Sequence, residues 1–154
     1  MADIYGRLTG KAGVCAATLG PGAINLMLGT ADAYTNSTPL VAIAAQVGLN
    51  RIYKETHQVI DMVSMYKPVT KWAGMLLTPA ATPETIRKAF KLAQTERPGA
   101  VFLTVPEDVE AMPVPQGIAP IPVNVVHTDA PSPTQIDRAV KVLMSAKRPI
   151  VLAA

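Results

Sequence analysis

The chain has 154 residues, of which 49% are hydrophobic and 16% are charged. This length and composition predict a globular protein with a buried core and exclude a disordered chain. The formal net charge is +3, and the lysines and arginines are scattered along the sequence, so the charge pattern gives no support for nucleic-acid binding.

Secretion and membrane insertion find no support in the sequence. Cys15 is the single cysteine, so an internal disulfide is impossible and a reducing compartment is the simplest interpretation. Residues 1–11 lack the apolar core of a signal peptide, and the longest apolar run, residues 40–45, is too short to span a bilayer. We therefore expect a cytoplasmic protein with neither a membrane nor a nucleic acid as its partner.

The first half of the chain predicts a strand, a helix and a second strand. Residues 14–18 and 40–45 are apolar runs without polar alternation, which is typical of strands buried on both faces. Between them, four apolar residues recur at i, i+3, i+4 and i+7 and predict the buried stripe of a helix: Ile24, Met27, Leu28 and Ala31. A strand, a helix and a strand over this length predict a right-handed βαβ unit and a parallel sheet.

The next part of the chain predicts two more helices and two more strands. Helical spacing of apolar residues from 59 to 66 predicts a helix that begins near Thr56 or His57 and ends at Pro68. Residues 72–77 and 100–105 have the pattern of strands. The helix between these strands has Thr82 as its predicted N-cap and Pro83 at its first position. Its predicted buried stripe is Ile86, Ala89, Phe90 and Ala93. We further expect core positions for Tyr66, Trp72 and the methionines, and surface or capping roles for Asp32 and Asp61.

Proline marks a change in composition at residue 113. Six prolines predict an extended linker over residues 113–131 and its border: Pro113, Pro115, Pro120, Pro122, Pro131 and Pro133. A capping box that starts at Ser132 predicts a further helix, and residues 149–154 have the pattern of a strand. We therefore expect one domain over residues 1–112 and the start of a second α/β domain over residues 132–154.

Gly20-Pro21-Gly22 separates the first predicted strand from the first predicted helix. Parallel α/β sheets bind ligands at such turns, because the helix N-terminus presents free N–H groups. The dinucleotide fingerprint needs a third glycine where Asn25 stands and an acidic residue where Gln46 stands, and no P-loop lysine follows. Two interpretations remain from the residues alone: the turn contacts a ligand other than a nucleotide phosphate, or it is only a tight turn.

Three segments together resemble a known enzyme family. They are MADIYGRLTGKAGVCAATLGPGAINLMLGTADAYTNSTPLVAIAAQ, HQVIDMVSMYKPVTKW and RPGAVFLTVPEDV. In their order and spacing they are similar to the pyrimidine-binding (PYR) domain of thiamine diphosphate enzymes, in the acetolactate synthase-like group. The resemblance implies a doubly wound, flavodoxin-like α/β domain that lacks its first strand and helix, followed by the start of a central domain.

The same resemblance implies a site, whereas on residue type alone the pair His57-Gln58 is typical of a solvated helix start. The residues implied to bind the aminopyrimidine ring of thiamine diphosphate are Gly20, Pro21, Gly22, Asn25 and Gln58. Gln58 is also the implied catalytic residue, near the reactive carbon of the cofactor, and His57 joins it on the substrate side. The family's catalytic glutamate is expected before Met1 and its Mg²⁺ site beyond Ala154, so we expect no metal ligand and no activity in this chain alone.

The implied function is that of a carboligase or decarboxylase, a transferase or lyase that acts on a 2-oxo acid such as pyruvate. The pattern is most like an acetolactate synthase large subunit, and it implies a homodimer or tetramer with active sites between subunits and possible binding of FAD. Biosynthetic members usually carry Pro-Arg where Gly48-Leu49 stand and Lys where Glu107 stands, so a catabolic role is equally open. The alternative is a non-catalytic α/β module, an incomplete gene product that acts only as an assembly partner.

Overall fold

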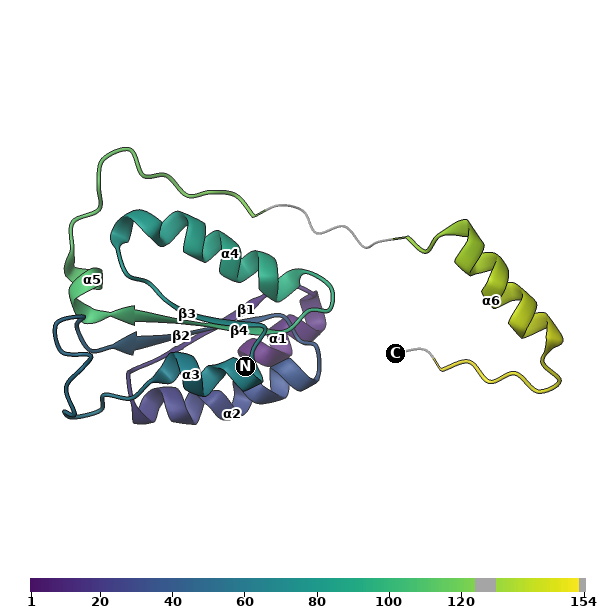
Figure 1. The fold of residues 1–154 in the computed structure, drawn as a ribbon, viewed down its shortest axis with the longest axis horizontal. Coiled ribbons are helices and arrows are strands. Elements are labelled where there is room, and N and C mark those ends of the chain that lie inside the picture. Colours follow the sequence, from purple (N-terminus) through teal and green to yellow (C-terminus); the bar gives the residue numbers. More distant parts are fainter. Residues whose placement is uncertain (124–129, 153–154) are drawn as a thin grey trace.

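The computed structural model describes residues 1–123 and 130–152. In this part of the chain a parallel sheet has the strand order β1-β2-β4-β3 (Figure 1). Its strands are β1 (Gly13–Ala17), β2 (Leu40–Gln46), β3 (Trp72–Met75) and β4 (Ala100–Pro106). Helices cover both faces of the sheet, so the predicted α/β class and parallel sheet are confirmed.

The strands form where continuous apolar runs were found, with ends shifted by a residue or two. β2 and β4 are the central pair and run in register from Leu40↔Ala100 to Gln46↔Pro106. Almost every residue of these two strands is buried, because helices pack on both faces. β1 and β3 lie at the edges and are only partly covered.

Six α-helices occur in the described residues, two of which the sequence analysis did not predict. They are α1 (Ala2–Thr9), α2 (Pro21–Thr35), α3 (Met62–Tyr66), α4 (Thr82–Gln94), α5 (Glu107–Ala111) and α6 (Pro133–Ser145). Short 3₁₀ turns cover Lys67–Val69 and Pro79–Ala81. Figure 1 shows α4 on one face of the sheet and α2 and α3 on the other. The two helices that the sequence patterns did not predict are α1, which directly precedes β1, and α5, which directly follows β4.

The buried stripe predicted for α2 is wrong at two of its four positions, whereas Met27 packs against the core as predicted. Ile24 and Leu28 are 49% and 82% exposed, whereas Ala23, Thr30 and Ala33 are buried. Small side chains let the helix axis approach the sheet closely, and the larger apolar residues then lie on other sides of the helix. Because α2 is apolar around most of its circumference, the spacing of its large residues does not identify the face that packs on the sheet.

Tyr66 joins α3, α2 and the sheet in the core. Its ring stacks on Phe102 with a centroid distance of 3.6 Å, and its hydroxyl donates a hydrogen bond of 2.6 Å to the carbonyl of Ala23. Burial raises the pKa of Tyr66 to about 12. The predicted core position of Tyr66 is confirmed. Trp72 is half-buried, with the Lys88 ammonium 4.7 Å from its ring centroid.

The predicted stripe of α4 is confirmed, but two predicted helix starts are displaced. Ala89 and Ala93 of α4 are buried against the sheet. Thr82 is the first residue of α4 and Ala81 is its N-cap, one position earlier than predicted. α3 begins at Met62, with Asp61 as its N-cap. The Asp61 carboxylate accepts a 3.0 Å hydrogen bond from the Ser64 amide, so its expected capping role is confirmed.

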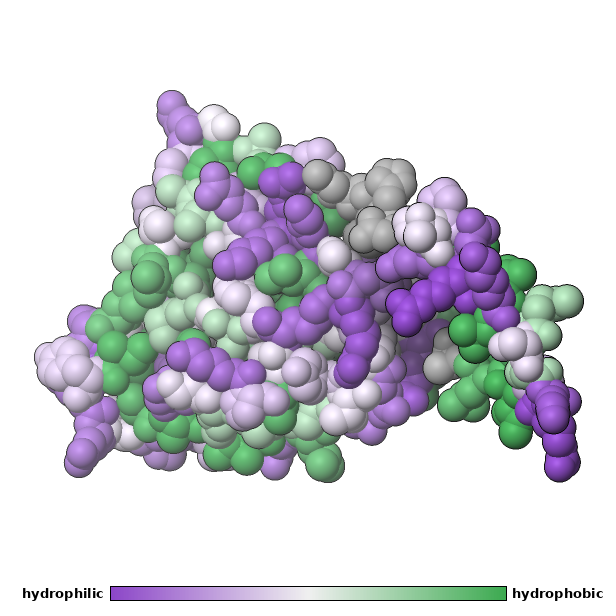
Figure 2. All heavy atoms as spheres, turned by 45° about the vertical axis from the view of Figure 1, so that its right-hand side comes forward, coloured by the Kyte–Doolittle hydropathy of each residue, from purple (hydrophilic) through white to green (hydrophobic). Residues whose placement is uncertain are grey.

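Beyond α5 the described chain has little regular structure until α6. The predicted capping box at Ser132 is confirmed by its reciprocal hydrogen bonds with Gln135. Residues 149–152 form no strand, because they have no neighbouring strand to pair with among the described residues. Figure 2 shows apolar side chains at the surface of this part of the molecule, and Met144 and Leu152 are 82% and 93% exposed. Not all methionines are therefore in the core.

Residues 124–129 of the predicted linker and residues 153–154 of the predicted last strand lie outside the described residues. In the described part of the chain, no helix combines the length and apolar character that crossing a membrane requires.

Candidate functional site

All strands of the sheet are parallel, so their carboxyl ends meet at one edge of the sheet. Four segments leave the sheet there: the glycine turn after β1, the loop of residues 47–60 after β2, residues 76–81 after β3, and α5 after β4. Figure 1 shows α5 and the loop after β2 together at this edge. Ligands of open α/β sheets bind outside the carboxyl ends of the strands, so this edge is the place to look for a site.

The glycine turn is a strained helix start that needs glycine. Gly20 is the N-cap of α2 and has φ 57° and ψ −118°, a combination that residues with a Cβ rarely adopt. Pro21 fixes the first helical position, and the Ile24 amide donates to the Gly20 carbonyl at 3.0 Å. The loop and helix geometry predicted for this stretch is therefore present.

Gly20 lies directly against Gln58, which is far away in the sequence. A Cβ atom on Gly20 would lie 2.8 Å from the Gln58 Cβ and 3.0 Å from the Gln58 carbonyl oxygen. Gln58 itself has a left-handed backbone, with φ 63°. The structure thus brings Gln58 against the glycine turn, as the family resemblance implies for one site.

The fold leaves little room for a side chain at Gly22. A Cβ on Gly22 would lie 2.6 Å from the Thr18 Cγ2 and 3.7 Å from the Ala17 Cβ. A side chain at position 22 would therefore require the exposed Thr18 side chain, which follows β1, to move. The close approach of a cofactor to Gly22 remains a prediction.

Two side-chain amides at this end of the fold are available to a ligand. Asn25 is exposed in α2, and Gln58 is half-buried beside Gly20. Among the hydrogen bonds of the described residues, none involves either amide group. Each amide offers both a donor and an acceptor.

His57 does not occupy the helix start that the spacing predicted. It lies in a turn closed by a 3.2 Å hydrogen bond from the Val59 amide to the Thr56 carbonyl, four residues before the Asp61 N-cap. Residues 59 and 60 are not helical, so α3 begins at Met62 and not near His57. His57 is exposed, and its place on the substrate side remains a prediction.

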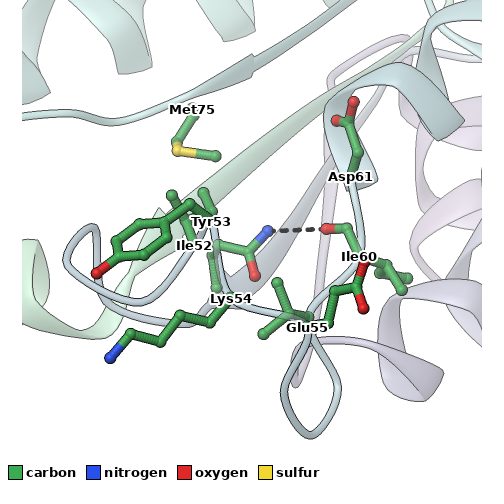
Figure 3. A pocket seen from close by; sticks show the side chains of 9 residues that line it. Ile52, Tyr53, Lys54, Glu55, Ile60, Asp61 and Met75 are labelled. Carbon is green, nitrogen blue, oxygen red and sulfur yellow. Dashed lines mark hydrogen bonds between the residues drawn. The ribbon is translucent and has the colours of Figure 1, made fainter.

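A hollow of about 370 Å³ opens beside this turn (Figure 3). Its lining residues come from the ends of β2 and β3 and from the loop after β2: Gln46, Ile52, Tyr53, Lys54, Glu55, Val59, Ile60, Asp61 and Met75. Gln46 is buried and holds the loop, since its Nε2 donates to the Ile60 carbonyl at 3.2 Å and its Oε1 accepts from the Val47 amide at 3.0 Å. Figure 3 shows the first of these bonds.

From the sequence, Gln46 only argues against a dinucleotide site. Its anchoring role was missed, and the one available signal was a polar residue at the end of a buried strand.

The charges around the hollow are mixed. Lys54 is the single basic residue of the lining, and Glu55 and Asp61 are acidic. Hydrogen bonds from the side chain and the backbone amide of Ser64 hold the pKa of Asp61 below its ordinary value. In residues 1–123 and 130–152, no three His, Cys, Asp or Glu side chains are grouped so that they could hold a metal ion.

Comparison with known proteins assigns the first part of the chain to a family. Residues 1–65 match the family model described as "Thiamine pyrophosphate enzyme, N-terminal TPP binding domain". This segment contains both the glycine turn and Gln58. The chain carries an N-terminal domain of this thiamine pyrophosphate enzyme family, and the resemblance predicted from its motifs is confirmed.

The curated relatives are acetolactate synthases and similar enzymes. The chain is 41% identical to the probable acetolactate synthase large subunit of Methanococcus aeolicus, over 99% of this chain and 26% of that protein. It is 39% identical to the protein of the same description from Methanocaldococcus jannaschii, over 99% of this chain and 27% of that protein. It is 34% identical to the glyoxylate carboligase of Escherichia coli O157:H7, over 99% of this chain and 26% of that protein. The chain therefore spans about a quarter of the length of these relatives.

Proposed function

We propose that this chain supplies the pyrimidine-binding part of the active site of a thiamine diphosphate-dependent enzyme. The observation that carries this proposal is the direct contact between Gly20 and Gln58 at the carboxyl edge of the sheet. The family to which residues 1–65 belong gives the ligand class. A tight turn alone would not need a second, distant segment with an unpaired amide beside it.

The residues of this edge suit an aminopyrimidine ring. Such a ring carries acceptor nitrogens and an amino donor, and the amides of Asn25 and Gln58 offer both complementary groups. Gly20 has no side chain, and the space that a Cβ would take is filled by Gln58, so a ring bound at this edge would contact Gln58 rather than the Gly20 backbone. We assign Asn25 to holding the ring and Gln58 to the side of the ring that faces the substrate.

When bound, thiamine diphosphate supplies a nucleophilic carbon that adds to the carbonyl group of a 2-oxo acid. The part of this chain is to bind and orient the ring. We assign the diphosphate and its Mg²⁺, and FAD if it is used, to other parts of the protein.

The substrate class follows from the names of the relatives. Acetolactate synthases and a glyoxylate carboligase are among them, so we propose a carboligase or decarboxylase that acts on a small 2-oxo acid. We also propose an assembly in which two subunits share each site, in the cytoplasm. Exposed Leu8 and Leu28, at 81% and 82%, support a partner on the helical face of α1 and α2.

A titration of this chain followed by NMR tests the proposal. The ligands are thiamine diphosphate and, separately, 4-amino-5-hydroxymethyl-2-methylpyrimidine. We expect both to shift the backbone amides of Gly20, Gly22 and Gln58 and the side-chain amide of Asn25. Asn25→Ala should weaken binding about tenfold, because a hydrogen bond to the ring is lost, whereas Gln58→Ala should keep most of the affinity.

The control is Gln116→Ala, which removes an exposed amide outside the site. Equal affinities of the Asn25 and Gln116 variants, or shifts confined to the hollow of residues 52–61, would contradict the proposed pyrimidine site.

A further inference from the structure

The loop after β2 and the helix after β4 leave the sheet side by side. β2 and β4 are paired as far as Gln46↔Pro106, so the residues that follow start as neighbours. The Asp108 Oδ2 accepts a 2.8 Å hydrogen bond from the Leu49 amide. The Glu107 Oε1 accepts a longer one, 3.4 Å, from the Gly48 amide and lies 3.4 Å from the Arg51 Nη1.

The Asp108 carboxylate is held in one orientation. Its second oxygen, Oδ1, accepts from the Val109 amide at 2.9 Å, so both oxygens are engaged. A Cβ on Gly48 would lie 3.2 Å from the Asp108 Cγ and Oδ2, so the glycine leaves the carboxylate the room it occupies. The Leu49 side chain packs against the cluster of Leu76, Leu103 and Val109, which fixes the start of the loop from the other side.

Because its first residues are held in place, the loop after β2 has a fixed position where it forms one wall of the hollow. The loop continues through two turns, in which the Arg51 amide donates to the Gly48 carbonyl at 2.8 Å and the Lys54 amide donates to the Arg51 carbonyl at 2.9 Å. Ile52, Tyr53 and Lys54 then line the hollow (Figure 3). Glu107 and Asp108 do not line it themselves, yet they hold the backbone that carries this wall.

We propose that Asp108, assisted by Glu107, is a positioning residue that sets the shape of the hollow and thereby determines which 2-oxo acid the site accepts. The choice of a 2-oxo acid as ligand rests on the proposed function, whereas the control of the loop does not. Gly48 and Glu107 are the donor and the acceptor of one contact. Proline at position 48 would have no N–H to donate and lysine at position 107 would have no acceptor, so either change would remove this contact.

The first test measures amide hydrogen exchange of residues 49–54 in this chain. Asp108→Ala should speed exchange about tenfold or more, because the backbone loses a charged acceptor. Asp108→Asn should restore most of the protection, because its amide oxygen still accepts. Glu110→Ala, an exposed acid on the same helix, should leave exchange unchanged. The methyl resonance of Met75, which also lines the hollow, should shift in the Asp108→Ala chain only.

The second test compares kcat/KM for glyoxylate, pyruvate and 2-oxobutanoate in the complete enzyme that carries this domain. Asp108→Ala should change the ratios among these substrates about fivefold or more, while activation by thiamine diphosphate keeps its midpoint. Unchanged exchange in the Asp108→Ala chain, or unchanged substrate ratios, overturns the proposal. Failure of thiamine diphosphate to shift Gly20 and Gln58 overturns the proposed function instead and leaves the loop result standing.

Discussion

Substitution of Gly20 by alanine should be far more damaging than substitution of another glycine in the same helix. The backbone of Gly20, at φ 57° and ψ −118°, would hold an alanine in a conformation that costs about 1–3 kcal/mol. The new Cβ would also lie 2.8 Å from the Gln58 Cβ and 3.0 Å from its carbonyl oxygen, and such overpacking costs about 1–3 kcal/mol more. We therefore expect Gly20→Ala to lower the free energy of unfolding by about 2–6 kcal/mol.

Gly29→Ala is the matched control for this prediction. Gly29 lies in the interior of α2, and a Cβ there would have no atom within 4 Å. Alanine is favoured over glycine in helices, so this change should raise the free energy of unfolding by about 0.5–1 kcal/mol.

Urea denaturation measures both effects, with far-ultraviolet circular dichroism for the helices and the fluorescence of the single tryptophan, Trp72, for the sheet. If the two variants differ by less than about 1 kcal/mol with equal m-values, the close contact between Gly20 and Gln58 is refuted, because strain and overpacking together predict at least about 2 kcal/mol.

Three further changes test the fold around the site. The pKa of Tyr66 is raised to about 12, so the free energy of unfolding should fall as pH rises from about 10 toward 12, and a pH series of urea denaturations should show a smaller fall for Tyr66→Phe. Asp61→Ala should lower that free energy by about 1 kcal/mol through loss of the α3 cap. Because the pKa of Asp61 is lowered in the fold, this difference should vanish as the carboxylate is protonated in acid. Gly22→Val should destabilise the chain by clashing with Thr18, and Thr18→Ala should recover part of the loss in a double-mutant cycle; a strictly additive cycle would contradict the contact.

The strands could be predicted from the sequence because burial on both faces leaves an unbroken apolar run. Leu40–Gln46 and Ala100–Pro106 are such runs. Their pairing partner could not be predicted from the runs themselves, since apolar composition carries no register. The face of α2 was mispredicted for a related reason: the helix packs on the sheet through Ala23 and Ala33, and small residues give a weak signal beside exposed Ile24 and Leu28.

The site could be predicted only in part. The glycine turn has a local signature because its backbone conformation requires glycine, and it was found. Gln58 has none, because its position depends on the contact with Gly20 across the fold, and only the family resemblance indicated it. The hydrogen bond from the Leu49 amide to the Asp108 carboxylate was not predicted at all. An acid after a buried strand is common, and only the β2–β4 register places it beside this loop.

Because the backbone of Gln58 is left-handed, the residue that would be most stable at this position is not the residue whose side chain is present there. At φ 63° glycine or asparagine is the residue of lowest energy, and glutamine carries a penalty of about 1–2 kcal/mol. Selection for heat resistance alone would therefore replace Gln58 by glycine, which removes the side chain, or by asparagine, which draws the amide back toward the backbone. Because glycine and asparagine would both shorten the side chain that lies against the glycine turn, stabilising libraries built on this domain should hold position 58 fixed.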